Sequence, residues 1–202
     1  MAQNVDTVSS SGNNAKKIVR LGLVLFAVAA ITGLILGVVN EITIEPIRRT
    51  QERLRNEALA AALPEAETFE TVELKSDAAP IVKDVQEGKS GGFVVGYCVT
   101  AAPTGYAGPV EVVVGITSSG GVRGIRILSQ SETPGLGAKA PLPKFSGQYD
   151  NKDVENLVVV KTPPSAANEI QAISGATITS NAVTLGVNTA LAYWRDNLKG
   201  GN

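Results

Sequence analysis

The sequence predicts an α+β protein in which one N-terminal transmembrane helix is followed by an antiparallel-sheet domain with flanking helices. Three observations lead to this prediction. Residues 21–39 carry no charge, residues 93–128 contain segments that alternate with period two, and the chain closes on a helical amphipathic pattern. Because strands are grouped in the middle and helices lie at the ends, the two kinds of element are expected to be segregated.

The N-terminal part divides into a tail and a membrane anchor. Residues 1–15 are rich in Ser and Asn, lack an apolar period and are predicted to be a disordered tail. The 19 uncharged residues 21–39 match a hydrocarbon core of about 30 Å at about 1.5 Å per residue, so 16–40 is predicted to be the anchor. A cleavable signal peptide is the alternative, but its apolar core is usually shorter, about 7 to 15 residues.

The orientation of the anchor rests on its flanking charges. Basic residues stand on both sides of the span: Lys16, Lys17 and Arg20 before it, and Arg48, Arg49 and Arg53 after it. The counts nearly balance, but the first group directly precedes the span and follows a short tail. We therefore expect a single-pass protein of the cell membrane, with the N-terminus inside and the main domain extracytoplasmic.

A second helix is expected directly after the anchor, over residues 41–66. Pro46 suits the first turn of a helix, apolar residues then recur at roughly helical spacing, and Pro64 ends the pattern. A rigid spacer is the favoured role. A lipid-binding or partner-binding role is the alternative, because an amphipathic helix can also lie on a membrane surface.

Residues 67–202 are predicted to form the main domain. Alternating apolar residues predict strands around Phe93–Val99 and Val110–Ile116, and Ser118–Gly121 supplies a turn into a third strand, 122–128. Apolar residues on one helical face from Thr177 to Leu198, followed by Gly200, predict a C-terminal helix with a glycine stop.

Composition excludes several classes of function. The net charge of -1 and the pI near 5.6 leave no basic surface for nucleic acid. One cysteine and no histidine exclude an intramolecular disulfide, a histidine-based zinc site and a cysteine-held iron–sulfur cluster, so no metal site is predicted. Redox chemistry in this chain would therefore need an organic cofactor or a group held by oxygen ligands.

Two glycine-rich segments are the candidate functional residues. The first is Ser131–Gly137, directly after a strand. Gly135 and Gly137 permit close approach of a ligand, and Glu132 and Thr133 supply polar groups. Leu136 is its apolar member. The alternative is an ordinary turn, which is what most such loops are.

The second segment, Ser174–Ser180, leads into the C-terminal helix. Small residues at Gly175 and Ala176 and a first turn that contains Thr177 and Thr179 make it suitable for an anion, which free N–H groups and the helix dipole would stabilise. One alternative is simple N-capping, which accounts for one hydroxyl but not for four in seven residues. Another is a nucleophilic threonine, which lacks an evident base.

These two segments carry a resemblance to a known family. The Glu-Thr-Pro-Gly-Leu-Gly loop at 132–137 and the Ser-Gly-Ala-Thr motif at 174–177 resemble those of the G subunit of the Rnf-type ion-translocating ferredoxin:NAD oxidoreductase. Residues 105–109 and 36–40 support the match, which covers nearly the whole chain except the tail. The related C subunit of the sodium-translocating NADH:quinone reductase shares both main motifs but is generally longer.

The resemblance implies an electron-carrier subunit with FMN held covalently by a phosphoester to Thr177, and with no catalytic residue of its own. Ser174, Gly175, Ala176 and Thr179 would surround the phosphate end. By the same analogy, Glu132, Thr133, Gly135 and Leu136 would border the flavin ring. The implied partners are the other subunits of the complex, membrane lipid and the flavin transferase that attaches FMN.

Other functions remain as alternatives at the level of sequence. A non-redox, membrane-anchored binding or assembly module would use the helix start only for an anion or a cap, and a threonine-dependent hydrolase is the third possibility. Gln171 departs from the family pattern, which usually has an acid three positions before the serine. Cys98 is expected to be a core residue and Lys161 a solvated charge.

Overall fold

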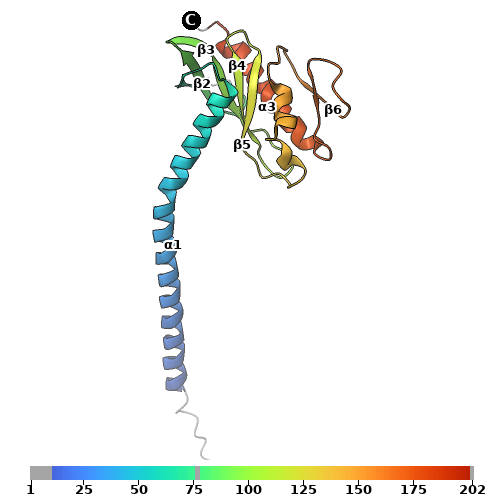
Figure 1. Cartoon of the computed structure of the whole chain (residues 1–202). Helices are drawn as coiled ribbons and strands as arrows, with labels where there is room; N and C mark the ends of the chain where they lie inside the picture. Colours follow the sequence, from blue (N-terminus) through green and yellow to red (C-terminus); the bar gives the residue numbers. More distant parts are fainter. Residues whose placement is uncertain (1–10, 76–77, 201–202) are drawn as a thin grey trace, which may run out of the picture. The chain divides into compact units, whose positions relative to one another are not determined.

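The computed structural model describes residues 11–75 and 78–200, with side chains from residue 16 onward (Figure 1). The chain divides into two compact units, residues 1–51 and 52–202. The predicted α+β class is confirmed, because a long apolar N-terminal helix precedes an antiparallel sheet with helices. Residues 1–10 of the predicted tail lie outside the described residues, and residues 11–15 belong to the helix instead.

Helix α1, Ser11–Ala62, is continuous and contains Pro46 in its interior. The expectation that a separate helix begins at Pro46 is therefore wrong. A proline inside a helix removes one backbone hydrogen bond. Ion pairs between side chains three or four residues apart stabilise the helix and partly offset this loss. Glu45 accepts from Arg48 at 3.0 Å and from Arg49 at 2.9 Å, so the charged side chains bridge the position of the proline.

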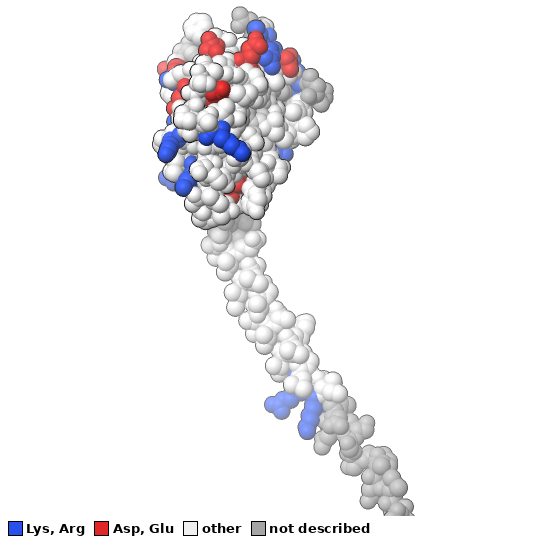
Figure 2. Space-filling view, turned by 90° about the vertical axis from the view of Figure 1, so that its right-hand side faces the viewer, with Lys and Arg blue, Asp and Glu red and all other residues white. Residues whose placement is uncertain are grey.

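The first unit contains a helical stretch that is long and apolar enough to cross a membrane. Within residues 16–62, an 18-residue window reaches a mean hydropathy of 2.6, and none of it is buried against protein. Figure 2 shows this part of the helix as a surface without charged side chains, with basic side chains at its lower end. By length and composition it meets the requirement for a transmembrane helix.

The second unit is built on a five-stranded antiparallel sheet in sequential order. Its strands are β1 Thr68–Val72, β2 Val82–Ser90, β3 Phe93–Ala101, β4 Glu111–Thr117 and β5 Val122–Ser129. The predicted hairpin is confirmed, because β4 pairs with β5 through the turn at 118–121, where Gly120 has a φ of +98°.

Both faces of this sheet are covered, one of them by the C-terminal helix. Helix α3, Thr177–Tyr193, packs against the face that carries Val112, Val114 and Ile116, and continues into a π-helical turn, η3, Trp194–Leu198. These strand residues are fully buried, as their period-two spacing requires for one face of a sheet. The predicted C-terminal helix is thus confirmed.

The last turns of α1 cover the other face of the sheet. Leu59, Ala62 and Leu63 form a second core cluster with Cys98 and Val113, all of them at most 2% exposed. The end of the predicted spacer helix is therefore part of the folded core. Cys98 is a small core residue, as expected, and burial raises the pKa of its thiol to about 12, with a smaller contribution from the charge of Asp84.

Short elements connect β5 to α3. They are η1 Gly137–Lys139, α2 Pro143–Ser146, η2 Gly147–Tyr149 and the parallel pair β6 Val158–Val160 and β7 Glu169–Gln171. Tyr149 is fully buried and its hydroxyl lies 2.7 Å from the hydroxyl of Thr184 on α3. This contact holds the connecting segment on the helix. A hydrogen bond from Thr179 to Glu132 joins the loop that follows β5 to the first turn of α3.

Candidate functional site

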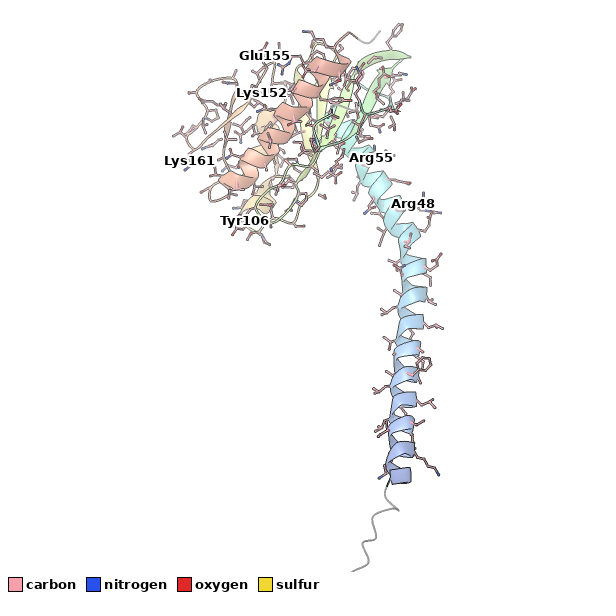
Figure 3. All side chains as sticks on the ribbon, turned by 180° about the vertical axis from the view of Figure 1, so that it is seen from behind. Arg48, Arg55, Tyr106, Lys152, Glu155 and Lys161 are labelled. Carbon is pink, nitrogen blue, oxygen red and sulfur yellow. The ribbon has the colours of Figure 1, made fainter. Side chains whose placement is uncertain are left out.

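A pocket of about 570 Å³ lies where the two glycine-rich segments meet at the start of α3. Its volume is within the range of small-molecule and cofactor sites, roughly 300–1,000 Å³. Three segments line it, and their residues are Tyr106, Glu132, Thr133, Leu136, Gly137, Gly175, Ala176, Thr177, Ile178 and Thr179. Figure 3 shows Tyr106 at the end of the unit where α3 begins, with Glu155 near the other end of that helix.

The structure brings together most of the residues that the sequence singled out. Seven of the nine candidates line the pocket, and the exceptions are Gly135 and Ser174. Gly135 shapes the loop from outside the lining, and Ser174 is exposed one residue before Gly175. Sequence reasoning missed Tyr106 and Ile178 as lining residues, whereas Gly137 had been expected to allow close approach of a ligand. The signal for Tyr106 was present, since residues 105–109 were part of the family resemblance.

The loop after β5 is a tight turn that presents Leu136 at the pocket rim. The Leu136 N–H donates to the Thr133 carbonyl at 3.1 Å, and Gly135 has a φ of +80°. With Pro134 before the glycine, this is the pattern of a type II turn, which requires a positive φ at its third position. Leu136 is 42% exposed and therefore offers an apolar surface to a ligand.

The start of α3 has no side-chain cap. Its N-cap residue is Ala176, and Gly175 before it has a φ of +75°. The first N–H groups of a helix have no partner within the helix and carry the positive end of its dipole. An uncapped helix start that opens into a pocket is a favourable place for a phosphate group.

The hydroxyl groups around the helix start differ in their hydrogen-bond partners, so simple N-capping does not explain why several hydroxyl residues stand here. Thr179 donates to Glu132 at 2.5 Å, whereas Ser180 accepts from the Ile173 N–H and donates to the Ala176 carbonyl, both at 2.9 Å. Thr177 is half-buried, and within the described chain its hydroxyl has no hydrogen-bond partner. It is thus the free hydroxyl at the uncapped helix start.

Glu132 is the only buried carboxylate in the described part of the chain, with 6% of its surface exposed. One oxygen, Oε1, accepts from the backbone N–H groups of Tyr106 and Ala107, each at 2.9 Å. The other, Oε2, accepts from the Thr179 hydroxyl. Glu132 therefore connects the loop 105–109, the loop 131–137 and the first turn of α3.

These hydrogen bonds determine the charge of Glu132. Burial by itself raises the pKa of a carboxyl group, but the hydrogen bonds from Thr179, Ala107 and Tyr106 together outweigh it and hold the pKa below the usual value. Two glycines make room for the carboxylate. A Cβ at Gly105 would lie 2.6 Å from Oε1, and one at Gly137 would lie 2.5 Å from Oε2.

Comparison with known proteins assigns the chain to a family. The model of the FMN-binding domain matches residues 105–192, which contain all the lining residues. The G subunit of the Na⁺-translocating ferredoxin:NAD⁺ oxidoreductase complex of Acetobacterium woodii is 40% identical over 194 residues, which cover 90% of this chain and 93% of the relative. This chain belongs to the family of Rnf G subunits. The resemblance found in the sequence is thus confirmed.

Other relatives agree with the assignment. The G subunit of the proton-translocating complex of Clostridium ljungdahlii is 37% identical and covers 80% of this chain and 83% of the relative. The crystal structure of the C subunit of the Na⁺-translocating NADH-quinone reductase of Parabacteroides distasonis has a TM-score of 0.59, with 20% identity over 79% of this chain and 99% of that one. That likeness shows a shared fold.

The described residues contain no cluster of three or more potential metal ligands, and Glu132 is the only carboxylic acid in the pocket lining. Both of its oxygens are occupied by donors, so it is not placed as a general base for Thr177. Lys161 is exposed and does not line the pocket, as expected of a solvated charge (Figure 3).

Proposed function

We propose that this chain is the FMN-carrying electron-transfer subunit of a membrane-bound, ion-translocating ferredoxin:NAD oxidoreductase complex. The observation that carries the proposal is the pocket in which the two family motifs meet, within the residues matched by the FMN-binding domain. The 40% identity to an Rnf G subunit over nearly the full chain favours this complex over the quinone reductase, whose C subunit is 20% identical.

In this proposal, Thr177 holds FMN through a phosphoester on its hydroxyl. The support is its place in the uncapped first turn of α3, where the helix dipole stabilises a phosphate, and its lack of another hydrogen-bond partner in the described chain. Gly175 and Ala176 leave room for the phosphate group. When bound, FMN supplies reversible electron uptake, which no side chain of this protein can supply.

The apolar rim is proposed to hold the flavin ring. Tyr106, Leu136 and Ile178 line the pocket and are 71%, 42% and 55% exposed. Exposed apolar side chains around a concave site are typical of surfaces that a ligand covers. Thr133 lines the same pocket and offers a hydroxyl to the polar edge of the ring.

The location and the partners are part of the same proposal. The apolar part of α1 would anchor the chain as a single span, with residues 52–202 on the extracytoplasmic side. Other subunits of the complex would receive and supply electrons, membrane lipid would surround the span, and a flavin transferase would attach FMN to Thr177. A threonine-dependent hydrolase is disfavoured because no free base lines the pocket.

The decisive test uses the full chain, produced together with a flavin transferase and purified from membranes. We expect the purified protein to be yellow and to keep its flavin fluorescence on a denaturing gel. Thr177→Ala should lose the fluorescence, whereas the neighbouring hydroxyl variant Ser174→Ala should keep it. Colourless wild-type protein, or a fluorescent Thr177→Ala band, would contradict the proposal.

A further inference from the structure

Glu132 has hydrogen-bond partners that the sequence did not predict. The family loop suggested that its carboxylate borders the polar edge of the flavin ring. In the structure both of its oxygens accept hydrogen bonds from the protein, two from backbone N–H groups and one from Thr179. A carboxylate whose oxygens are occupied in this way is a positioning residue for the groups around it.

The charge of Glu132 is uncompensated by any cation in the pocket lining. Its partners are two N–H groups and one hydroxyl, all neutral, and no lysine or arginine lines the pocket. A buried charge keeps its ionised form when enough donors are directed at it. The carboxylate is therefore a fixed negative charge on the wall of the pocket.

We propose that Glu132 assembles the cofactor pocket by joining its three segments, and that its negative charge lowers the reduction potential of the flavin held there. The second part rests on the proposed function. If FMN bound there took up two electrons from the complex and one proton from solvent, the pocket would hold one more negative charge than before. A fixed carboxylate on the pocket wall disfavours that product and so lowers the potential.

The test compares two glutamates that accept hydrogen bonds from the same kinds of donor, of which only Glu132 lines the pocket. Glu169 likewise accepts from backbone N–H groups and a hydroxyl, those of Ser165 and Ala166, but it lies outside the pocket. In the full chain in lipid nanodiscs, Glu132→Gln keeps the shape of the side chain and removes its charge. We expect its flavin midpoint potential to be higher than that of wild type, and that of Glu169→Gln to be unchanged.

A second readout does not depend on the flavin. In a Thr177→Ala background, Glu132→Gln should speed amide hydrogen exchange at Tyr106 and Ala107 at least tenfold, while Glu169→Gln should leave both amides as they were. If Glu132→Gln does not fold, the wild-type protein with isotopically labelled glutamate is studied by infrared spectroscopy in place of the variant. The spectra should show a carboxylate band that shifts when the flavin is reduced.

The outcomes separate this inference from the proposed function. Loss of covalent flavin from wild type itself would overturn the proposed function. A flavin-loaded Glu132→Gln protein with the wild-type potential, or an infrared band insensitive to flavin reduction, would overturn the electrostatic role. Unchanged exchange at Tyr106 and Ala107 would overturn the assembling role.

Discussion

Thr177 differs from Thr179 and Ser180 in the same helical turn because its hydroxyl makes no hydrogen bond within the described part of the chain. Thr179 and Ser180 are engaged within the protein, the first with Glu132 and the second with the loop before α3. Both are buried, whereas Thr177 is half-buried and faces the pocket. This difference is the physical reason why Thr177, among the hydroxyls of this helical turn, is the one proposed to carry FMN.

Glu132 should make the stability of the fold depend on pH. Because its pKa is lowered on folding, its contribution is fully present above the pKa of an unfolded glutamate, about 4.3, and is lost as the pH falls through the lower folded value. In a Thr177→Ala background at pH 7, Glu132→Gln should reduce the free energy of unfolding by about 1–3 kcal/mol. The difference from the parent should shrink as the pH falls below about 4.

Fluorescence of Trp194, the only tryptophan of the sequence and a buried one, can follow this unfolding. A difference between the two proteins that stays constant from pH 7 to pH 3 would mean that the shape of the side chain, and not its charge, is what the fold requires.

Leu136 should affect the flavin without affecting its attachment. It lines the pocket from the loop 131–137, a different segment from the one that carries Thr177, and its Cδ2 lies 3.0 Å from where a Cβ on Gly175 would stand. Leu136→Asp should therefore keep the covalent FMN on a denaturing gel but shift the absorption or the potential of the folded protein, because these depend on the contacts of the ring. Unchanged spectra and potential would show that the loop is an ordinary turn.

At the level of single residues, the sequence predicted which side chains meet but not how they are bonded. Small residues and hydroxyls pointed to the helix start, and a glycine loop after a strand pointed to the second half of the site. The hydrogen bonds that Glu132 accepts from Tyr106 and Ala107 join residues 26 and 25 positions apart in the sequence. Local sequence pattern carries no information on such a contact, so the role of Glu132 had to come from the structure.

Among the elements, the sheet and α3 follow the predicted pattern, whereas α1 does not. Alternation of apolar residues marks one buried face of a strand, but here β3 and β4 are buried on both faces because the end of α1 covers the second one. Pro46 was misleading, since proline suits a first helical turn and is also tolerated in an interior turn at the loss of one hydrogen bond.

The packing of α1 on the sheet depends on a glycine. A Cβ at Gly115 of β4 would lie 2.1 Å from the carbonyl oxygen of Ala62, so only glycine lets the helix end approach the strand. Gly115→Ala should lower the free energy of unfolding by about 1–3 kcal/mol, a typical cost of overpacking. Gly108→Ala, where a Cβ would meet nothing within 4 Å, should change it by less than about 0.5 kcal/mol. Equal effects in thermal unfolding would refute this account of the contact.

At the scale of the whole molecule, the apolar helix of the first unit is the part expected to lie in the membrane. The 28 steps from Arg20 to Arg48 make about 42 Å of helix, which is close to the full thickness of a bilayer with its headgroups, about 40–45 Å. Both arginines would then lie at headgroup level, and the uncharged stretch between residues 21 and 39 would lie in the hydrocarbon.

Two measurements on intact cells and membranes check this placement. The chain should stay in the membrane fraction after alkaline and high-salt washing, because a hydrophobic span is held without ionic contacts. A protease-sensitive tag fused after residue 202 should be cleaved from outside the cytoplasm. Release by washing would contradict the anchor, and a protected tag would reverse the orientation.

The attachment of FMN to Thr177 is the central claim, and peptide mapping tests it most directly. Trypsin should release residues 162–195 as one peptide, since the chain has no lysine or arginine between Lys161 and Arg195. We predict that this peptide from wild-type protein carries the mass of FMN less one water, and that fragmentation places the added mass on Thr177. An unmodified peptide, or an added mass on Ser174 or Thr179, would contradict the account.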